Sequence, residues 1–191
     1  DFDIDHEGTG GATTADNLET LKEILTPSNA PHVVLLGIGG NDLLNGLSVN
    51  DAIDNINQII DILQSNKSTV TIFIEQIAPA QSSYMTTDLT QTIENFNNNI
   101  LSVASQQTDG ESNVISIDMY SNWSDTYMAD DVHYNSSGAK EVADRYMNAI
   151  DAFYWSYFHP IGGLILHTLI IFFVGNINKP YIYENYKVII Y

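Results

Sequence analysis

The chain of 191 residues is long enough for one domain with a hydrophobic core, and it carries 24 acidic against 6 basic residues, a formal net charge of −18. This balance argues against nucleic acid and anionic membrane surfaces as partners, because both require a basic surface. Cysteine is absent, which excludes disulfides, thiolate metal sites and a cysteine nucleophile in the chain.

Charged and aromatic side chains are distributed unevenly along the chain. Residues 1–150 hold 22 of the 24 acidic residues, whereas residues 151–191 balance two acidic against two basic residues and hold 11 of the 20 aromatic ones. We expect a boundary at this shift, with a domain over 1–154 and a hydrophobic, aromatic-rich tail over 155–191.

The tail contains an apolar run over 161–174 that only His167 and Thr168 interrupt. A run of about 14 residues is shorter than the roughly 20 needed to span a bilayer, so the tail predicts at most a contact with a membrane surface. Three interpretations stay open: a segment that packs on the domain, a membrane-associated segment, or translated sequence that was not selected to fold. The third is favoured, because Ile, Tyr, Asn and Lys recur there without a clear period.

Apolar residues follow helical and strand spacing in turn over residues 14–150. In chain order, we predict a helix from Thr14, a strand over 32–36, a helix after Ser48, a strand over 70–74, a helix over 89–101, a strand over 114–117 and a helix from Ser136 or Ser137. Leu101 in the third helix is expected to face the core, as are Ala143 and Met147 in the last. Strands that alternate with helices predict an α/β fold with a parallel sheet covered by helices on both faces.

The stretch VVLLGIGGNDLL (33–44) joins an apolar run to a glycine-rich break. Its continuous aliphatic residues are typical of a strand buried on both faces, and the glycines permit a sharp turn directly after it. Asn41 and Asp42 then lie at the carboxyl end of a buried parallel strand, where open α/β sheets bind their ligands. The same two residues also favour turns, so they fit either a ligand site or a simple turn cap.

A second candidate is the pair formed by Asp130 and His133. At this separation, in a turn or at the start of a helix, the two side chains lie on the same side. A carboxylate that accepts from the Nδ1–H of histidine fixes the tautomer and leaves Nε2 as a general base. An acidic surface loop with an incidental histidine would show the same spacing, so both interpretations stay open at this point.

Taken together, the order and spacing of three stretches resemble the SGNH or GDSL hydrolase family. The stretches are DHEGTGGATTADNL (5–18), VVLLGIGGNDLL (33–44) and ADDVHYNSSGAKEVADRY (129–146), and the resemblance covers roughly residues 1–150. Within that family, the first stretch looks most like the esterases that remove acetyl groups from plant-type polysaccharides.

The resemblance implies a serine esterase with a flavodoxin-like, three-layer α/β/α sandwich around a parallel sheet. Its motifs would make Gly11 a backbone donor and Asn41 a side-chain donor to the oxyanion, with Asp130 and His133 as two members of a Ser-His-Asp triad. Asp42 would support the loop rather than take part in the chemistry. The implied partner is a small-molecule or polysaccharide ester, and no cofactor is implied.

The family's nucleophilic serine belongs to a GDS motif after the first strand, and the chain does not contain this motif. The first serine is Ser28, and none lies upstream of the glycine turn over 8–11. Residues 1–5, DFDID, resemble the end of a second strand, which favours an amino-terminal truncation and a sheet that lacks its first strand. We therefore expect the triad serine upstream of this chain; loss of the nucleophile is the alternative.

The predicted function is hydrolysis of small acyl esters, with acetyl groups on carbohydrates as the expected substrates. Two alternatives stay open: a catalytically inactive carbohydrate-binding module, and a lipid-directed, lysophospholipase-like esterase. Such a protein is expected to be secreted, either extracellular or periplasmic. The sequence leaves the oligomeric state open.

Acidic clusters and aromatic residues near these motifs have both a functional and a structural interpretation. Aspartates at 1, 3 and 5 and at 125, 130 and 131 could bind a cation, but solvated or capping roles are favoured, and no metal site is predicted. Trp123, Tyr127 and Tyr134 flank the candidate base, where they could stack on a sugar or pack in the core.

Overall fold

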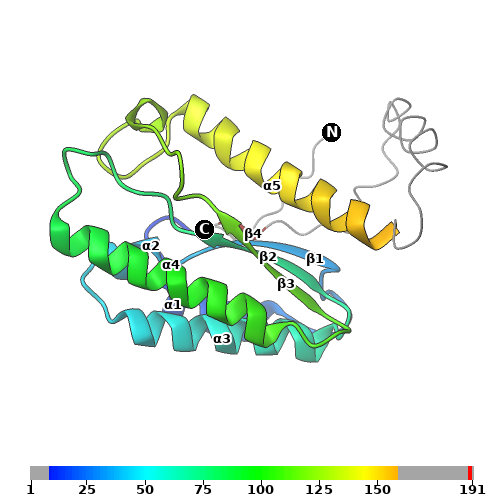
Figure 1. The fold of residues 1–191 in the computed structure, drawn as a ribbon. Helices are drawn as coiled ribbons and strands as arrows, with labels where there is room; N and C mark the ends of the chain where they lie inside the picture. Colours follow the sequence, from blue (N-terminus) through cyan, green and yellow to red (C-terminus); the bar gives the residue numbers. More distant parts are fainter. Residues whose placement is uncertain (1–8, 159–188, 191) are drawn as a thin grey trace.

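A parallel sheet with helices on both faces forms the centre of the molecule (Figure 1). The structure is a computed structural model, and it describes residues 9–158 and 189–190. Within these residues the strands follow the order β3-β2-β1-β4. Their bounds are Val33–Gly37 for β1, Thr71–Gln76 for β2, Asn113–Asp118 for β3 and Ile189–Ile190 for β4. The predicted α/β fold with a parallel sheet is confirmed.

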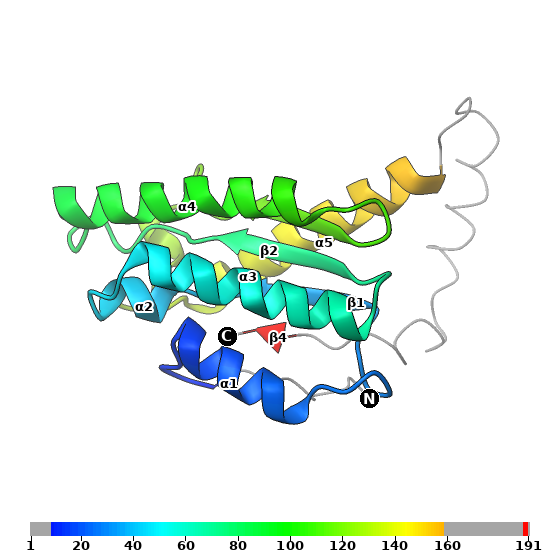
Figure 2. The ribbon, with the colours of Figure 1, turned by 90° about the horizontal axis from the view of Figure 1, so that it is seen from below.

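The helices divide between the two faces of the sheet. In chain order they are α1 (Thr14–Ile24), α2 (Gly40–Leu44), α3 (Val49–Asn66), α4 (Thr87–Gln107), the 3-10 turn η1 (Asp125–Tyr127) and α5 (Ser136–Phe158). Figure 2 shows α1, α3 and α4 together on one face, whereas α5 crosses the other. This arrangement gives the three layers that the sequence predicts.

The sheet separates two hydrophobic clusters, because successive strand residues point to opposite faces. Val34 and Ile72 belong to the cluster under α1, α3 and α4, while Val33 and Phe73 belong to the cluster under α5. Strand β2 lies between β1 and β3, and Ile72 and Phe73 are fully buried. The carboxyl ends of the parallel strands therefore share one edge of a sheet covered on both faces, the edge where such folds bind ligands.

Side-chain caps begin α1 and α3 where the sequence predicts these helices to start. Thr13 accepts from the Asp16 N–H while Asp16 accepts from the Thr13 N–H, which forms a capping box for α1. Ser48 accepts from the Asp51 N–H and so caps α3. Both caps were predictable because they depend on residues only three positions away.

Three predicted core residues are exposed instead. Leu101 is 46% exposed and Met147 is 55% exposed, and Ala143 also faces solvent. Each lies next to a residue of its helix that does face the sheet, such as Ile100 or Val142, and a step of one residue turns a helix by about 100°. The apolar stripes of α4 and α5 are therefore narrower than the sequence pattern predicts.

The boundary predicted near residue 154 falls inside a helix. Helix α5 continues to Phe158, and Ile189–Ile190 pair in parallel with Leu36–Gly37 of β1. The predicted strand at DFDID (1–5) and the apolar run over 161–174 lie outside the described residues. Among the residues described, none of the helices combines the length and apolar character needed to cross a bilayer.

Candidate active site

The predicted oxyanion glycine lies in a tight turn just before α1. The Ala12 N–H donates to the Thr9 carbonyl at 3.2 Å, and Gly11 has φ +79°. A four-residue turn with positive φ at its third position favours glycine there, since other residues rarely adopt that conformation. Gly11 is exposed, so its backbone is accessible at the surface of the turn.

A second glycine sets the start of α2 directly after β1. Gly39 has φ +103°, and a Cβ at this position would overlap the Phe96 ring. Glycine is therefore required both by the backbone conformation and by the packing. The sequence predicts only a turn here, but the structure shows that Gly40–Leu44 form a short helix, with Asn41 and Asp42 in its first turn.

The Asn41 side chain contacts the glycine turn. Its Nδ2 donates to the Ala12 carbonyl at 2.9 Å, directly after Gly11 in the chain. The amide group carries two N–H donors, so this bond orients the group and a second donor remains. The structure thus places Asn41 against the turn that contains Gly11, and the role of both residues as oxyanion donors stays a prediction.

Asp42 joins α2 to the start of α1. Its side chain is buried, and it accepts hydrogen bonds from the Thr14 N–H at 2.9 Å and the Thr14 Oγ1–H at 2.7 Å. Asn55 of α3 donates to the same Thr14 hydroxyl at 3.1 Å. Asp42 therefore joins α2 to α1 beside Asn41, in agreement with the predicted supporting role, and Thr14 extends the link to α3.

His133 pairs with Asp130, which confirms the predicted partner. The His133 Nδ1 lies 2.9 Å from Asp130 Oδ2 and 3.1 Å from Oδ1. Backbone N–H groups of Val132 and His133 also donate to Oδ1, and these bonds, followed by the His133 ring, lower the Asp130 pKa to about 2. Because an ionised carboxylate only accepts, Nδ1 carries the donated hydrogen and neutral His133 keeps Nε2 as its basic atom.

The loop that carries His133 is pinned to the start of α5 by Asn135. Its Nδ2 donates to the carbonyls of Thr126 and Met128 at 2.8 and 3.1 Å, while its Oδ1 accepts from the N–H groups of Ser137 and Gly138. The sequence motifs did not single out Asn135. The signal was the N-cap position one residue before Ser136, where asparagine is among the preferred residues.

A partly buried glutamate, also not identified from the sequence, lies on the α5 face of the sheet. The Glu75 carboxyl packs against Gly37 of β1, where any Cβ would lie within 2.9 Å of its atoms. Loss of solvent raises the Glu75 pKa, a shift that Tyr146 of α5 partly offsets. Burial raises the pKa of Tyr146, and the nearby Glu75 raises it further. The signal in the sequence was a single acidic residue in the apolar run VTIFIEQ.

The aromatic residues beside His133 pack against one another. The Trp123 ring lies 5.2 Å from that of Tyr127 and 5.0 Å from that of Tyr134, measured between ring centroids. The Arg145 guanidinium lies 5.6 Å from the Trp123 ring centroid. These contacts favour the packing interpretation over a stacking platform for a sugar.

Two pairs of contacting groups make up the site: Asn41 with the Gly11 turn, and His133 with Asp130. Both pairs lie on the same edge of the sheet. Asn41 follows the carboxyl end of β1, and the loop with His133 follows the carboxyl end of β3, which is parallel to β1 (Figure 1). That the two pairs meet around one substrate stays a prediction.

Two of the three aspartates near His133 that the sequence offers as cation ligands are engaged with the protein. Asp125 accepts from the Ser82 N–H and hydroxyl, both at 2.9 Å, and Asp130 accepts from its own loop. Across residues 9–158 and 189–190, no group of three or more His, Cys, Asp or Glu side chains is arranged to hold a metal ion. The cluster at Asp1, Asp3 and Asp5 lies outside the described residues.

The order of the glycine turn, the Asn41 segment and the Asp130–His133 loop identifies the family. Residues 1–141 match the model of the GDSL-like Lipase/Acylhydrolase family. The chain belongs to this family. No curated protein matches the chain.

Solved structures of GDSL-like acylhydrolases and carbohydrate esterases share the fold. A carbohydrate esterase family 3 protein from Talaromyces cellulolyticus is 24% identical, with a TM-score of 0.69 over 80% of this chain and 72% of that chain. The Clostridium thermocellum family 3 carbohydrate esterase is 27% identical, with a TM-score of 0.63 over 78% and 71%. The acetyl xylan esterase AlAXEase is 20% identical, with a TM-score of 0.62 over 75% and 78%.

Proposed function

We propose that this GDSL-family chain supplies the general base and the oxyanion donors of a serine esterase. This esterase removes small acyl groups from carbohydrates, and the acyl group that we propose is acetyl. The observation that carries the proposal is the Asp130–His133 pair, with Nδ1 held by a carboxylate and Nε2 left as the base. The similarity to carbohydrate esterases and to an acetyl xylan esterase supports the substrate class. Action on such polymers fits an extracellular or periplasmic location, which we propose as well.

In this mechanism, His133 Nε2 removes the proton from a serine hydroxyl supplied upstream of residue 1, as the serine attacks the ester carbonyl. The Gly11 N–H and the second N–H of Asn41 stabilise the negative oxygen of the tetrahedral intermediate. As the bond between the acyl carbon and the sugar oxygen breaks, His133 gives the proton to that departing oxygen, which leaves as a hydroxyl group. A water molecule, activated by the same base, releases the acyl group from the serine. Asp130 stabilises the protonated ring throughout.

The test compares the 191-residue chain with a chain extended upstream by a strand that ends in Gly-Asp-Ser. We expect the extended chain to hydrolyse p-nitrophenyl acetate and acetylated xylan, and the short chain to show no detectable turnover. In the extended chain, Asn41→Ala should lower kcat roughly 10²- to 10³-fold, and Asp130→Asn roughly 10⁴-fold. His133→Ala removes the base and should be at least as harmful as Asn41→Ala.

The matched control is Asp131→Asn, which changes the adjacent carboxyl group. Asp131 contacts Gln81 through its backbone carbonyl, so its substitution should leave kcat within about twofold. Robust turnover by the short chain would contradict the proposal, as would equal losses from Asp130→Asn and Asp131→Asn. An extended chain that binds xylan without hydrolysing it would instead support an inactive binding module.

A further inference from the structure

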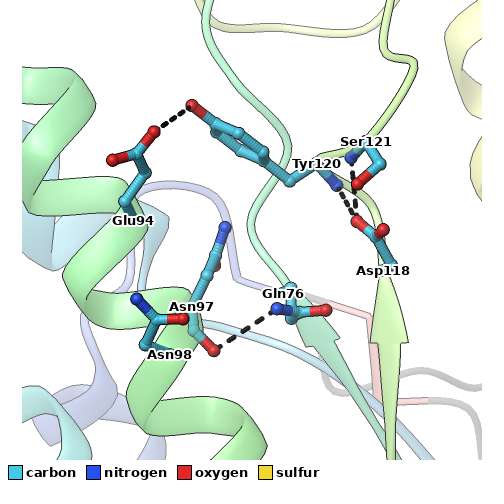
Figure 3. Close-up of a pocket in the computed structure, with 7 residues that line it drawn as sticks. All are labelled: Gln76, Glu94, Asn97, Asn98, Asp118, Tyr120 and Ser121. Carbon is cyan, nitrogen blue, oxygen red and sulfur yellow. Dashed lines mark hydrogen bonds between the residues drawn. The ribbon is translucent and has the colours of Figure 1, made fainter.

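A polar pocket lies beside the carboxyl ends of β2 and β3. Neither Asp130 nor His133 is among its lining residues. Its volume is about 250 Å³, and Figure 3 shows its lining side chains, which come from β2, α4, β3 and the segment after β3. The lining residues are Gln76, Glu94, Asn97, Asn98, Asp118, Tyr120 and Ser121. Gln76 is the last residue of β2 and Asp118 the last of β3, so the pocket opens on the edge that carries Asn41 and the His133 loop.

The chemistry of the lining limits what the pocket can bind. No cationic or aliphatic side chain is among its lining residues, so it offers no partner for a phosphate or carboxylate and no apolar wall for an acyl chain. Amide, hydroxyl and carboxylate groups together present both donors and acceptors. A neutral ligand with several hydroxyl groups requires this mixture, because each hydroxyl both donates and accepts.

Hydrogen bonds within the protein hold several of these groups in place. The buried Asn97 side chain accepts from the Ile77 N–H at 2.7 Å and donates to the Ile77 carbonyl at 2.9 Å, and the backbone carbonyl of Asn97 accepts from Gln76 Nε2 at 3.4 Å. Asp118 Oδ1 accepts from the N–H groups of Tyr120 and Ser121, both at 2.8 Å. The pocket is therefore preorganised, which lowers the entropic cost of binding.

Two carboxylates in the pocket raise the alternative of a cation, but their bonding disfavours it. Asp118 Oδ1 already accepts two backbone hydrogen bonds, and the Tyr120 hydroxyl donates to Glu94 at 3.4 Å. Glu94 and Asp118 are the only acidic lining residues, and the described chain contains no metal-binding group of three such side chains. Hard cations need six or more oxygen ligands, and the fixed lining supplies few of them.

We propose that this pocket is a carbohydrate subsite that binds one sugar residue of the polymer next to the acylated one. This inference rests on the proposed function and adds a binding determinant to it. The cavity is smaller than the roughly 300–1,000 Å³ pockets that enclose drug-sized ligands, so it accommodates a single ring rather than an oligosaccharide. Gln76, Asn98 and Asp118 are the side chains that we expect to contact the sugar hydroxyls.

Binding is tested without catalysis, by NMR titration of the 191-residue chain with xylotriose and, separately, with cellotriose. We expect resonances of the Gln76 and Asn98 side-chain amides and of the Ser121 backbone amide to shift with at least one of them. Asn98→Ala should weaken that affinity about 3- to 10-fold, the effect of one lost hydrogen bond. Asn98 is exposed on α4, and alanine favours helices, so the variant should fold.

The matched control is Asn95→Ala, an exposed asparagine of the same helix that does not line the pocket. It should leave the affinity unchanged. A titration with CaCl₂ that shifts the same resonances, while neither sugar does, would identify a cation site and overturn the proposal. Sugar-induced shifts that spare the pocket would overturn it too.

Catalysis provides a second measurement, in the extended chain. Asn98→Ala should raise KM for acetylated xylo-oligosaccharides and leave kcat unchanged, while both parameters for p-nitrophenyl acetate stay the same, because that substrate has no sugar. If Asn98 served only folding, its substitution would change the kinetic parameters for both substrates alike, and that result would contradict the proposal. If the extended chain is inactive but the sugar still shifts the pocket resonances, the subsite stands and the proposed esterase function fails.

Discussion

The two halves of the candidate site are held in place in different ways. Beside β1, Asp42 is 2% exposed and accepts two hydrogen bonds from Thr14, which is 28 residues away in the chain. In the loop after β3, the side chains of His133 and Asp130 are 78% and 59% exposed, and their contacts span three residues. The oxyanion half thus depends on packing between helices, whereas the acid–base half depends on local loop geometry.

This difference implies that stability and activity respond separately to substitution. Changes near Asn41 disturb buried contacts that also hold α1, α2 and α3 together, so they should lower the free energy of unfolding. Changes at Asp130 should affect catalysis while the fold remains intact, since exposed charge pairs contribute little to stability. Three predictions test this comparison.

The largest effect is expected for Gly39→Ala. The substitution combines a disfavoured positive φ with overlap against the Phe96 ring, and should lower the free energy of unfolding by about 2–5 kcal/mol. Gly40→Ala is the control, because a Cβ at the next position meets no atom within 4 Å. Urea denaturation of both variants measures the difference. Equal stabilities would show that the start of α2 is not fixed by Gly39.

Asp42→Ala should come next, at about 2–4 kcal/mol, because it leaves two buried donors of Thr14 without their acceptor. Asp42→Asn should cost less, since an amide can accept from the Thr14 N–H and donate to its hydroxyl oxygen.

Two controls accompany these variants. Asp54→Ala, on the exposed face of α3, should change the free energy of unfolding by less than about 0.5 kcal/mol. Asp130→Asn should leave Tm unchanged. A drop in Tm for Asp130→Asn as large as that for Asp42→Ala would refute the contrast between the halves.

The smallest effect is expected for Glu75→Gln, a near-isosteric change against Gly37 of β1 and close to Tyr146 of α5. Burial raises the pKa of Glu75 in the folded state, so folding favours the protonated carboxyl group. The stability of the parent protein therefore includes the full contribution of Glu75 below the ordinary pKa of 4.5. It loses this contribution as the pH rises through the folded-state pKa. The Glu75→Gln variant should therefore gain stability relative to the parent as the pH rises from about 4 to about 8. The measurement is the difference in free energy of unfolding at each pH, with Glu19→Gln on the exposed side of α1 as control. A difference that does not vary with pH would show that Glu75 is not desolvated in solution.

Local spacing was enough to predict the order of the four longer helices and of β1, β2 and β3, the starts of α1 and α3, and the Asp130–His133 contact. Each depends on residues only a few positions apart, whose geometry a turn or a helix sets by itself. The same spacing overestimated the buried stripes of α4 and α5, since Leu101 and Met147 face solvent. How wide a stripe is buried depends on what packs against the helix.

Contacts between distant segments were decided by the tertiary structure alone. The bond from Asn41 to Ala12 spans 29 residues, and the Glu75 carboxyl lies against Gly37 because β1 and β2 pair in a parallel register that places Leu36 beside Ile74. The polar pocket likewise combines the ends of β2 and β3 with one face of α4. No periodicity in the sequence predicts these contacts. Strand register and helix docking follow from burial of the whole core rather than from any single segment.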